Sequence, residues 1–176
     1  STYSGQWVYD RQDGHGEETW SDGSHFTGRF VNGEKHGYGS FTWANGCTYA
    51  GEFQRNHMHG NGRYLWNDGR GYSGQWEASI MGPEGEMWWD DGRIYKGSFK
   101  QGRRHGNGEL IWPDGCSYLG EWQDGKQHGR GVTCVGKGVR RESFWQDGQF
   151  QRWITEDPVG QQPSSSASRR SLSKTG

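Results

Sequence analysis

The sequence has few of the residues from which an ordinary globular core is built. Hydrophobic residues make up only 28% of the 176 residues, whereas globular chains usually contain roughly 45–50%. No apolar run approaches the length of about 18 residues that suggests a transmembrane helix. Residues 1–7 also lack the charged and apolar regions of a secretory signal peptide. These absences favour a soluble, cytoplasmic protein without a two-layer core.

Cysteine and positive charge are scarce too. The 3 cysteines, Cys47, Cys116 and Cys134, have neither an even count nor CxxC spacing, so we expect no disulfide framework and a reducing compartment. The formal net charge is −1; residues 157–176 carry a net +2, which leaves −3 on residues 1–156. Nucleic acids and anionic membranes are normally bound by clustered Lys and Arg. The charge therefore excludes nucleic acid and argues against membrane lipid as partners.

Glycine and aromatic residues are abundant and follow a period of 23 residues. An aromatic residue, a glycine two places later and a second aromatic residue four places later recur six times without a slip. They are Tyr3-Gly5-Trp7, Phe26-Gly28-Phe30, Tyr49-Gly51-Phe53, Tyr72-Gly74-Trp76, Tyr95-Gly97-Phe99 and Tyr118-Gly120-Trp122. A regular period of this length is typical of a repeat protein.

The second half of each unit repeats as well. In four units it contains a His-Gly pair such as His36-Gly37; a Trp such as Trp43 follows, and the unit ends in Asp-Gly or Asn-Gly such as Asn45-Gly46. The last dipeptide is a strong signal of a hairpin turn. The pattern predicts two short strands per unit, with the aromatic and glycine positions on one face. We also expect aromatic rings of neighbouring strands to lie across the glycine backbone.

The predicted fold is all-β: an elongated, single-layer, twisted antiparallel sheet of tandem hairpins that extends roughly 60 Å. Residues 1–156 form this array, as six units and a partial seventh that acts as a cap, and residues 157–176 form a disordered, Ser-rich tail or linker. The fourth unit has Gly82-Pro83 in place of His-Gly, so we expect a local irregularity there. The first unit starts at Tyr3 with an uncovered edge, which suggests that a longer protein precedes it.

The sequence closely resembles the MORN repeat family (membrane occupation and recognition nexus), whose motif reads YxGxW, a spacer, HGxG, and a DG or NG turn. The resemblance covers residues 3 to about 150. It implies elongated, twisted sheets of consecutive hairpins that act as protein-binding and scaffold modules, often in cytoskeletal or ciliary assemblies. MORN repeats also accompany lipid-kinase and methyltransferase domains, and the family name suggests membrane or phosphoinositide binding.

Histidine is the residue type that most invites a catalytic or metal hypothesis. However, His36, His59, His105 and His128 occupy one position of different units, and neighbouring units lie about 10 Å apart. Zinc needs its nitrogen ligands at about 2.1 Å from one point, and a catalytic group is needed once rather than in every repeat. We therefore expect no metal, no cofactor and no catalytic residue, and do not expect an enzyme.

Binding of a protein partner is the function that this pattern favours. We expect an aromatic groove, open on one face of the sheet, that holds a helix or an extended segment. Alternatives are a structural homodimer, a phosphoinositide or membrane module and an enzyme-targeting module, and the same aromatic residues could equally form only core. The candidate groove residues are Trp20, Phe41, Trp43, Tyr64, Trp66, Met87, Trp89, Leu110 and Trp112.

Overall fold

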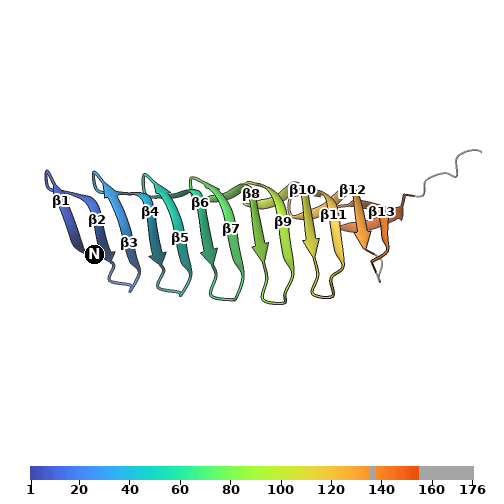
Figure 1. The fold of residues 1–176 in the computed structure, drawn as a ribbon, viewed down its shortest axis with the longest axis horizontal. Helices are drawn as coiled ribbons and strands as arrows, with labels where there is room; N and C mark the ends of the chain where they lie inside the picture. Colours follow the sequence, from blue (N-terminus) through green and yellow to red (C-terminus); the bar gives the residue numbers. More distant parts are fainter. Residues whose placement is uncertain (135–137, 155–176) are drawn as a thin grey trace, which may run out of the picture.

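The described residues, 1–134 and 138–154 of a computed structural model, form one elongated sheet. Fourteen strands lie in sequence order, each antiparallel to its chain neighbours (Figure 1). No part of the described chain forms a helix, and thus none that could cross a membrane. The expected all-β sheet of consecutive hairpins is confirmed. The predicted tail, residues 157–176, lies outside the described residues.

Strand lengths repeat as regularly as the sequence does. Odd-numbered strands have 7 residues and even-numbered strands up to β12 have 9. The strands are β1 Thr2–Val8, β2 Arg11–Thr19, β3 His25–Val31, β4 Glu34–Thr42, β5 Thr48–Gln54, β6 His57–Leu65, β7 Gly71–Glu77, β8 Ile80–Trp88, β9 Ile94–Lys100, β10 Arg103–Ile111, β11 Ser117–Gln123, β12 Lys126–Cys134, β13 Arg140–Gln146 and β14 Gln149–Trp153.

The two long edges of the sheet carry different connections (Figure 1). Each odd strand leads to the next even strand through a two-residue turn in which both residues have positive φ, as at Asn32 (51°) and Gly33 (84°). This is the geometry of a type I′ turn. Residues without a flexible backbone adopt it too, including Ala78 (47°) and Ser79 (67°). The sequence pattern does not predict a left-handed backbone at both of these positions.

The Asp-Gly and Asn-Gly pairs lie in longer loops on the opposite edge. In the first of them, the Trp20 backbone N–H donates to the Ser24 carbonyl at 2.9 Å, and the Ser24 N–H donates to Asp22 Oδ1 at 2.8 Å. This backbone hydrogen bond lowers the pKa of the Asp22 carboxyl. Only the glycine, Gly23, has positive φ (90°). The prediction of hairpin turns at these dipeptides is confirmed, because the loop joins the antiparallel strands β2 and β3 and its Gly23 N–H donates to the Trp20 carbonyl at 3.0 Å. Asp or Asn caps the loop, and glycine supplies its left-handed residue.

The His-Gly pairs mark a bulge near the start of the four even strands that contain them, β4, β6, β10 and β12. Gly60 has a φ of 58°, and the register of β5 with β6 shifts beside it. Glu52 closes the bulge, because its Oε2 accepts the Asn61 N–H at 2.8 Å. Glycine is needed at this position because the left-handed backbone disfavours other residues.

The expected irregularity of the fourth unit is present in the pairing of β8 with β9. That ladder begins only at Glu84 opposite Ser98, whereas the ladder of β6 with β7 already begins at Gly60 opposite Trp76. Pro83 stands at the start of the shortened ladder and has no backbone N–H to donate. The sheet nevertheless continues without a break in strand order.

Candidate partner-binding face

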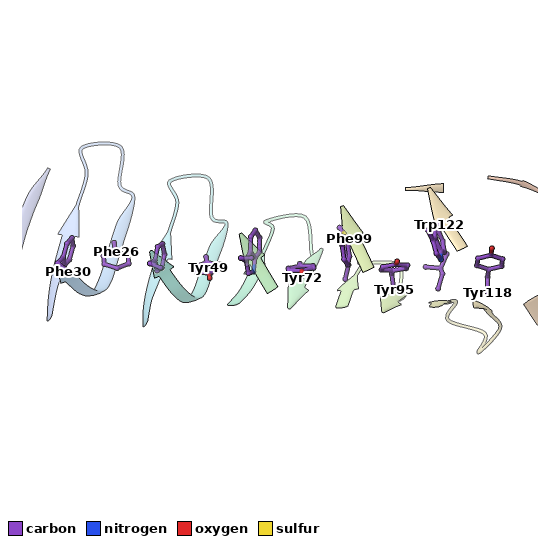
Figure 2. Packing of buried hydrophobic residues seen from close by; sticks show 12 residues of the cluster. Phe26, Phe30, Tyr49, Tyr72, Tyr95, Phe99, Tyr118 and Trp122 are labelled. Carbon is purple, nitrogen blue, oxygen red and sulfur yellow. The ribbon is translucent and has the colours of Figure 1, made fainter. Parts of the chain in front are cut away.

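One face of the sheet carries a buried row of aromatic rings, shown in Figure 2. In each unit the second aromatic ring stands edge-on to the first, as with Phe53 and Tyr49 (centroids 5.1 Å apart, planes at 88°). Trp76 of the next unit contacts Tyr49 in the same way, at 5.5 Å. The first ring of every interior unit has no exposed surface: Phe26, Tyr49, Tyr72, Tyr95 and Tyr118. This row is core and does not offer a surface to a partner.

Paired glycines let these rings lie close to the backbone. Gly51 faces Gly62 across β5 and β6. A Cβ atom at Gly62 would overlap the Tyr49 ring, and one at Gly51 would overlap the Gly62 backbone and the Tyr49 hydroxyl. The Tyr49 hydroxyl donates to the Glu52 carbonyl at 2.8 Å, and burial raises its pKa. The predicted packing of rings on glycine is confirmed, although each ring crosses a glycine of its own strand as well as one of the neighbouring strand.

A second row of rings lies outside the core and is half-buried. Neighbouring centroids are 5.3, 4.5, 5.2 and 4.6 Å apart, so the rings form a continuous row in which Trp20 and Phe41 are stacked and the later pairs are tilted. The row packs against the core from the side of the longer loops. Burial raises the pKa of Tyr64 in this row to about 12. We call it the aromatic ladder, and its members are Trp20, Phe41, Trp43, Tyr64 and Trp66.

The four other residues expected in the groove are placed differently. Met87 and Leu110 occupy the positions of Phe41 and Tyr64 in later units, and they belong to the core with 9% and 5% of their surface exposed. Trp89 and Trp112 are half-buried and pack against the core. The tryptophans of this set follow the last residue of their strands rather than lying within them, as Trp20 follows Thr19.

Lys35 and Arg104 are half-buried cations that lie over the rings of this face, and sequence reasoning did not identify them. Lys35 Nζ is 4.8 Å from the Trp20 ring centroid and 5.9 Å from that of Phe41. The Arg104 guanidinium is 4.6 Å from the Trp122 ring centroid. Burial lowers the pKa of both groups. Alignment of the repeats could have indicated them, since they share one position of the unit: Gln12, Lys35, Met58, Met81, Arg104 and Gln127.

An apolar hollow adjoins the ladder at the irregular fourth unit. It has a volume of about 340 Å³, and its lining includes Tyr64 and Trp66 of the ladder together with Met58, Ile80 and Met81. A second hollow of about 470 Å³ shares Ile80 and Met81 with the first. The Ile80 side chain is 50% exposed. The ladder and the hollows therefore form one apolar surface with depth as well as length.

The histidines do not converge on a site. His36, His59, His105 and His128 each precede a left-handed glycine of a different unit. Within residues 1–134 and 138–154, no group of three or more His, Cys, Asp or Glu side chains is placed to hold a metal ion. The histidines are thus a repeated feature of the bulge.

Comparison with known proteins identifies the repeat. The sequence model of the MORN repeat matches residues 3–25, 26–48, 49–69, 95–117 and 118–140, and it passes over the fourth unit, which contains Gly82-Pro83. No curated protein matches the chain. Among solved structures, the TCP10 domain of Danio rerio CPAP is 14% identical with a TM-score of 0.30, over 81% of this chain and 73% of that one. An inactive variant of virginiamycin B lyase from Staphylococcus aureus, solved with quinupristin, is 13% identical with a TM-score of 0.18, over 82% of this chain and 45% of that one.

Proposed function

The chain belongs to the MORN repeat family, and we propose that it is a non-catalytic scaffold that holds an amphipathic helix of a partner protein along its aromatic ladder. The observation that carries this proposal is the continuous, half-buried row of rings from Trp20 to Trp66, with an apolar hollow beside it. Contiguous apolar surface of this kind usually marks an interaction site. An aromatic side chain that is half-buried in its own fold is already positioned and loses little freedom on binding.

The repeat distance favours a helix over an extended segment. Successive units are two strands apart, which is about 9.6 Å, and seven residues of a helix rise about 10.5 Å. Apolar residues at heptad spacing would therefore meet one unit after another. A helix also satisfies its own backbone hydrogen bonds, whereas an extended segment laid over the face of a sheet would not.

The charges on this face indicate an acidic partner. Arg70 and Arg93 are paired with the loop carboxylates Asp68 and Asp91, both at 2.8 Å. In contrast, Lys35 takes part in none of the ion pairs of the described residues. The same holds for Arg104, which donates instead to the Gly125 carbonyl at 2.7 Å. Carboxylates that flank the apolar side of a helix would complement these two cations.

The groups with shifted pKa support a non-catalytic role. They are tyrosines on glycine pairs or in the ladder, loop aspartates and the two cations of the ladder face. Each position recurs along the array, whereas an active site is built once from different partners. The resemblance to scaffold arrays extends the proposal to a cytoplasmic partner in a cytoskeletal or ciliary assembly.

The test is selection of a displayed library of helical peptides of about 21 residues, which is three heptads, on the folded array. We expect enrichment of apolar residues at seven-residue spacing with Asp or Glu beside them. Affinity should fall at least about tenfold on the variant Trp43→Ala, Trp66→Ala. It should not change on the control Tyr38→Ala, Leu65→Ala, which removes two exposed side chains from the opposite face. Circular dichroism and thermal melting establish that both variants are folded.

Lys35→Glu is a second variant that leaves the ladder rings in place, and it should shift the selected peptides from acidic to basic residues. Three results would overturn the proposal. The first is no enrichment of helical sequences, and the second is equal binding by the ladder variant and the opposite-face control. The third is self-association of the array that the ladder variant abolishes, which would identify the ladder as the interface of a homodimer.

A further inference from the structure

Two cysteines that are distant in the sequence meet near the C-terminal end of the sheet. Cys116 lies in the loop between β10 and β11, and Cys134 is the last residue of β12. Their Sγ atoms are 3.1 Å apart although the residues are separated by 18 positions. This is about 1 Å longer than a disulfide bond of roughly 2.05 Å. The two sulfur atoms are therefore in contact, and a movement of about 1 Å would bring them to bonding distance.

The pair is a local feature rather than a property of the repeat. Cys47 occupies the same loop position as Cys116, but the residue that corresponds to Cys134 in its unit is Leu65. In the two intervening units these positions hold Arg70 with Trp88 and Arg93 with Ile111. Cys47 thus provides an internal control with the same loop and no thiol at the matching position.

Exposure also separates the pair from the third cysteine. Cys116 and Cys134 are both half-buried, whereas Cys47 is buried. A small oxidant in solution can therefore reach the pair more readily than it can reach Cys47.

We propose that Cys116 and Cys134 form a site of reversible thiol oxidation, at which a peroxide converts the two thiols into an intramolecular disulfide. One thiolate attacks an oxygen of hydrogen peroxide; the O–O bond breaks, and a sulfenic acid and one water result once the protons are transferred. The second thiolate attacks the sulfenic sulfur, the S–S bond forms and a second water leaves. Two thiols are oxidised and one peroxide is reduced to two waters, and a dithiol reductant reverses the change.

The disulfide would link the loop between β10 and β11 covalently to the end of β12. Within that loop the Trp112 N–H donates to the Cys116 carbonyl at 2.8 Å, and the Gly115 N–H donates to the Trp112 carbonyl at 2.9 Å. Oxidation therefore fixes the position of Trp112 relative to β12 and ties together the last complete units. This inference is independent of the proposed docking of a helix, because it requires only the two sulfur atoms and an oxidant.

The test treats the whole chain with hydrogen peroxide, removes the oxidant, and then unfolds and alkylates the protein before digestion with trypsin. Trypsin cleaves after Lys126 and Arg130, which lie between the two cysteines. A disulfide is then the sole link between the two fragments. We expect a linked peptide that is about 2 Da lighter than the sum of its parts, with Cys47 fully alkylated. The disulfide should also raise the thermal midpoint by roughly 5 °C, and a reductant should reverse this shift.

The variants separate the pair from a general effect of peroxide. Cys47→Ser should keep both the link and the thermal shift, and Cys134→Ser and Cys116→Ser should each lose both. The proposal is overturned by alkylation of Cys116 and Cys134 after oxidation, by oxidation of Cys47 at the same rate, or by disulfides that join two chains. A disulfide-linked peptide without the reversible rise in the thermal midpoint would also contradict the proposal, because the disulfide would then not stabilise the fold.

Discussion

The same five residues, Tyr-Ser-Gly-Gln-Trp, occur at 3–7 in the edge strand β1 and at 72–76 in the interior strand β7. Both segments form the same internal ring contact, with centroids 5.0 Å apart for Tyr3 and Trp7 and 5.1 Å apart for Tyr72 and Trp76. Their burial differs completely. Trp7 is 57% exposed and Trp76 is 5% exposed.

The difference is caused by the strand that precedes each segment. Trp76 lies against Tyr49 and Tyr64 of the preceding unit, with ring centroids 5.5 and 6.0 Å away, and its Nε1 donates to the Gly62 carbonyl at 3.1 Å. No described strand lies on the outer side of β1 to supply such contacts for Trp7. The motif therefore sets the geometry of the rings within a unit, whereas the neighbouring unit provides the burial and most of the stabilisation.

Truncation of the tryptophan should give the largest difference between the two segments. Trp76→Ala removes a buried ring and should lower the free energy of unfolding by about 3–5 kcal/mol. Trp7→Ala removes a ring that is largely in water and should cost less than about 1 kcal/mol. Urea denaturation followed by circular dichroism measures both. Equal losses would contradict the conclusion that burial depends on the preceding unit.

Substitution of the second glycine of each pair should give an intermediate difference. Gly16 faces Gly5 and Gly85 faces Gly74, and a new Cβ at Gly16 or Gly85 would overlap the ring of Tyr3 or Tyr72 respectively. The Tyr72 ring is fully buried and has no room to move, so Gly85→Ala should cost about 2–3 kcal/mol. The half-exposed Tyr3 ring can move outward, and Gly16→Ala should cost about 1 kcal/mol.

Hydrogen–deuterium exchange provides the matching local measurement for these glycine variants. Gly85→Ala should increase exchange in β7 and β8 and in the strands beside them, because interior units are coupled to neighbours on both sides. In Gly16→Ala the increase should be confined to β1 and β2. A uniform increase in both variants would mean that the edge unit is as strongly coupled as the interior one.

The regular parts of this fold could be predicted because they depend on local pattern. The spacing of Tyr49, Gly51 and Phe53 is sufficient to predict a strand with one buried face and a ring on glycine. The positive φ of both residues in the two-residue turns could not be predicted from residues such as Ala78 and Ser79, because the pairing of the flanking strands imposes it.

The candidate site was less accessible to sequence reasoning because it depends on contacts between units. Repeat spacing indicates that Phe41 and Leu110 share one position, but only the packing shows that the aromatic ring remains half-buried and the smaller Leu is core. The approach of Cys116 to Cys134 was not predicted, since their separation of 18 residues is not the repeat period. It depends on the path of a loop relative to the end of a strand.

Removal of the tyrosine hydroxyl should give the smallest difference between the two identical segments. The Tyr72 hydroxyl lies 2.8 Å from the Gln75 carbonyl and 3.1 Å from the Glu84 carbonyl, whereas the Tyr3 hydroxyl donates only to the Gln6 carbonyl, at 3.0 Å. Tyr72→Phe should therefore cost about 1 kcal/mol at neutral pH, and Tyr3→Phe about half of that. Denaturation of the two variants in parallel measures the difference.

The pH dependence of stability sharpens this last comparison. Burial raises the pKa of Tyr72 from 10.0 to about 12, so the folded state keeps a proton that the unfolded chain loses above pH 10. The contribution of Tyr72 to the free energy of unfolding should be level below pH 10 and fall as the pH rises from 10 towards 12. Tyr72→Phe removes one such titration and should reduce the slope by up to about 1.4 kcal/mol per pH unit.

Burial also raises the pKa of Tyr3, but that side chain is only half-buried, and Tyr3→Phe should change the slope less. If Tyr3→Phe flattened the curve as much as Tyr72→Phe, the edge unit would bury its hydroxyl as deeply as the interior unit does.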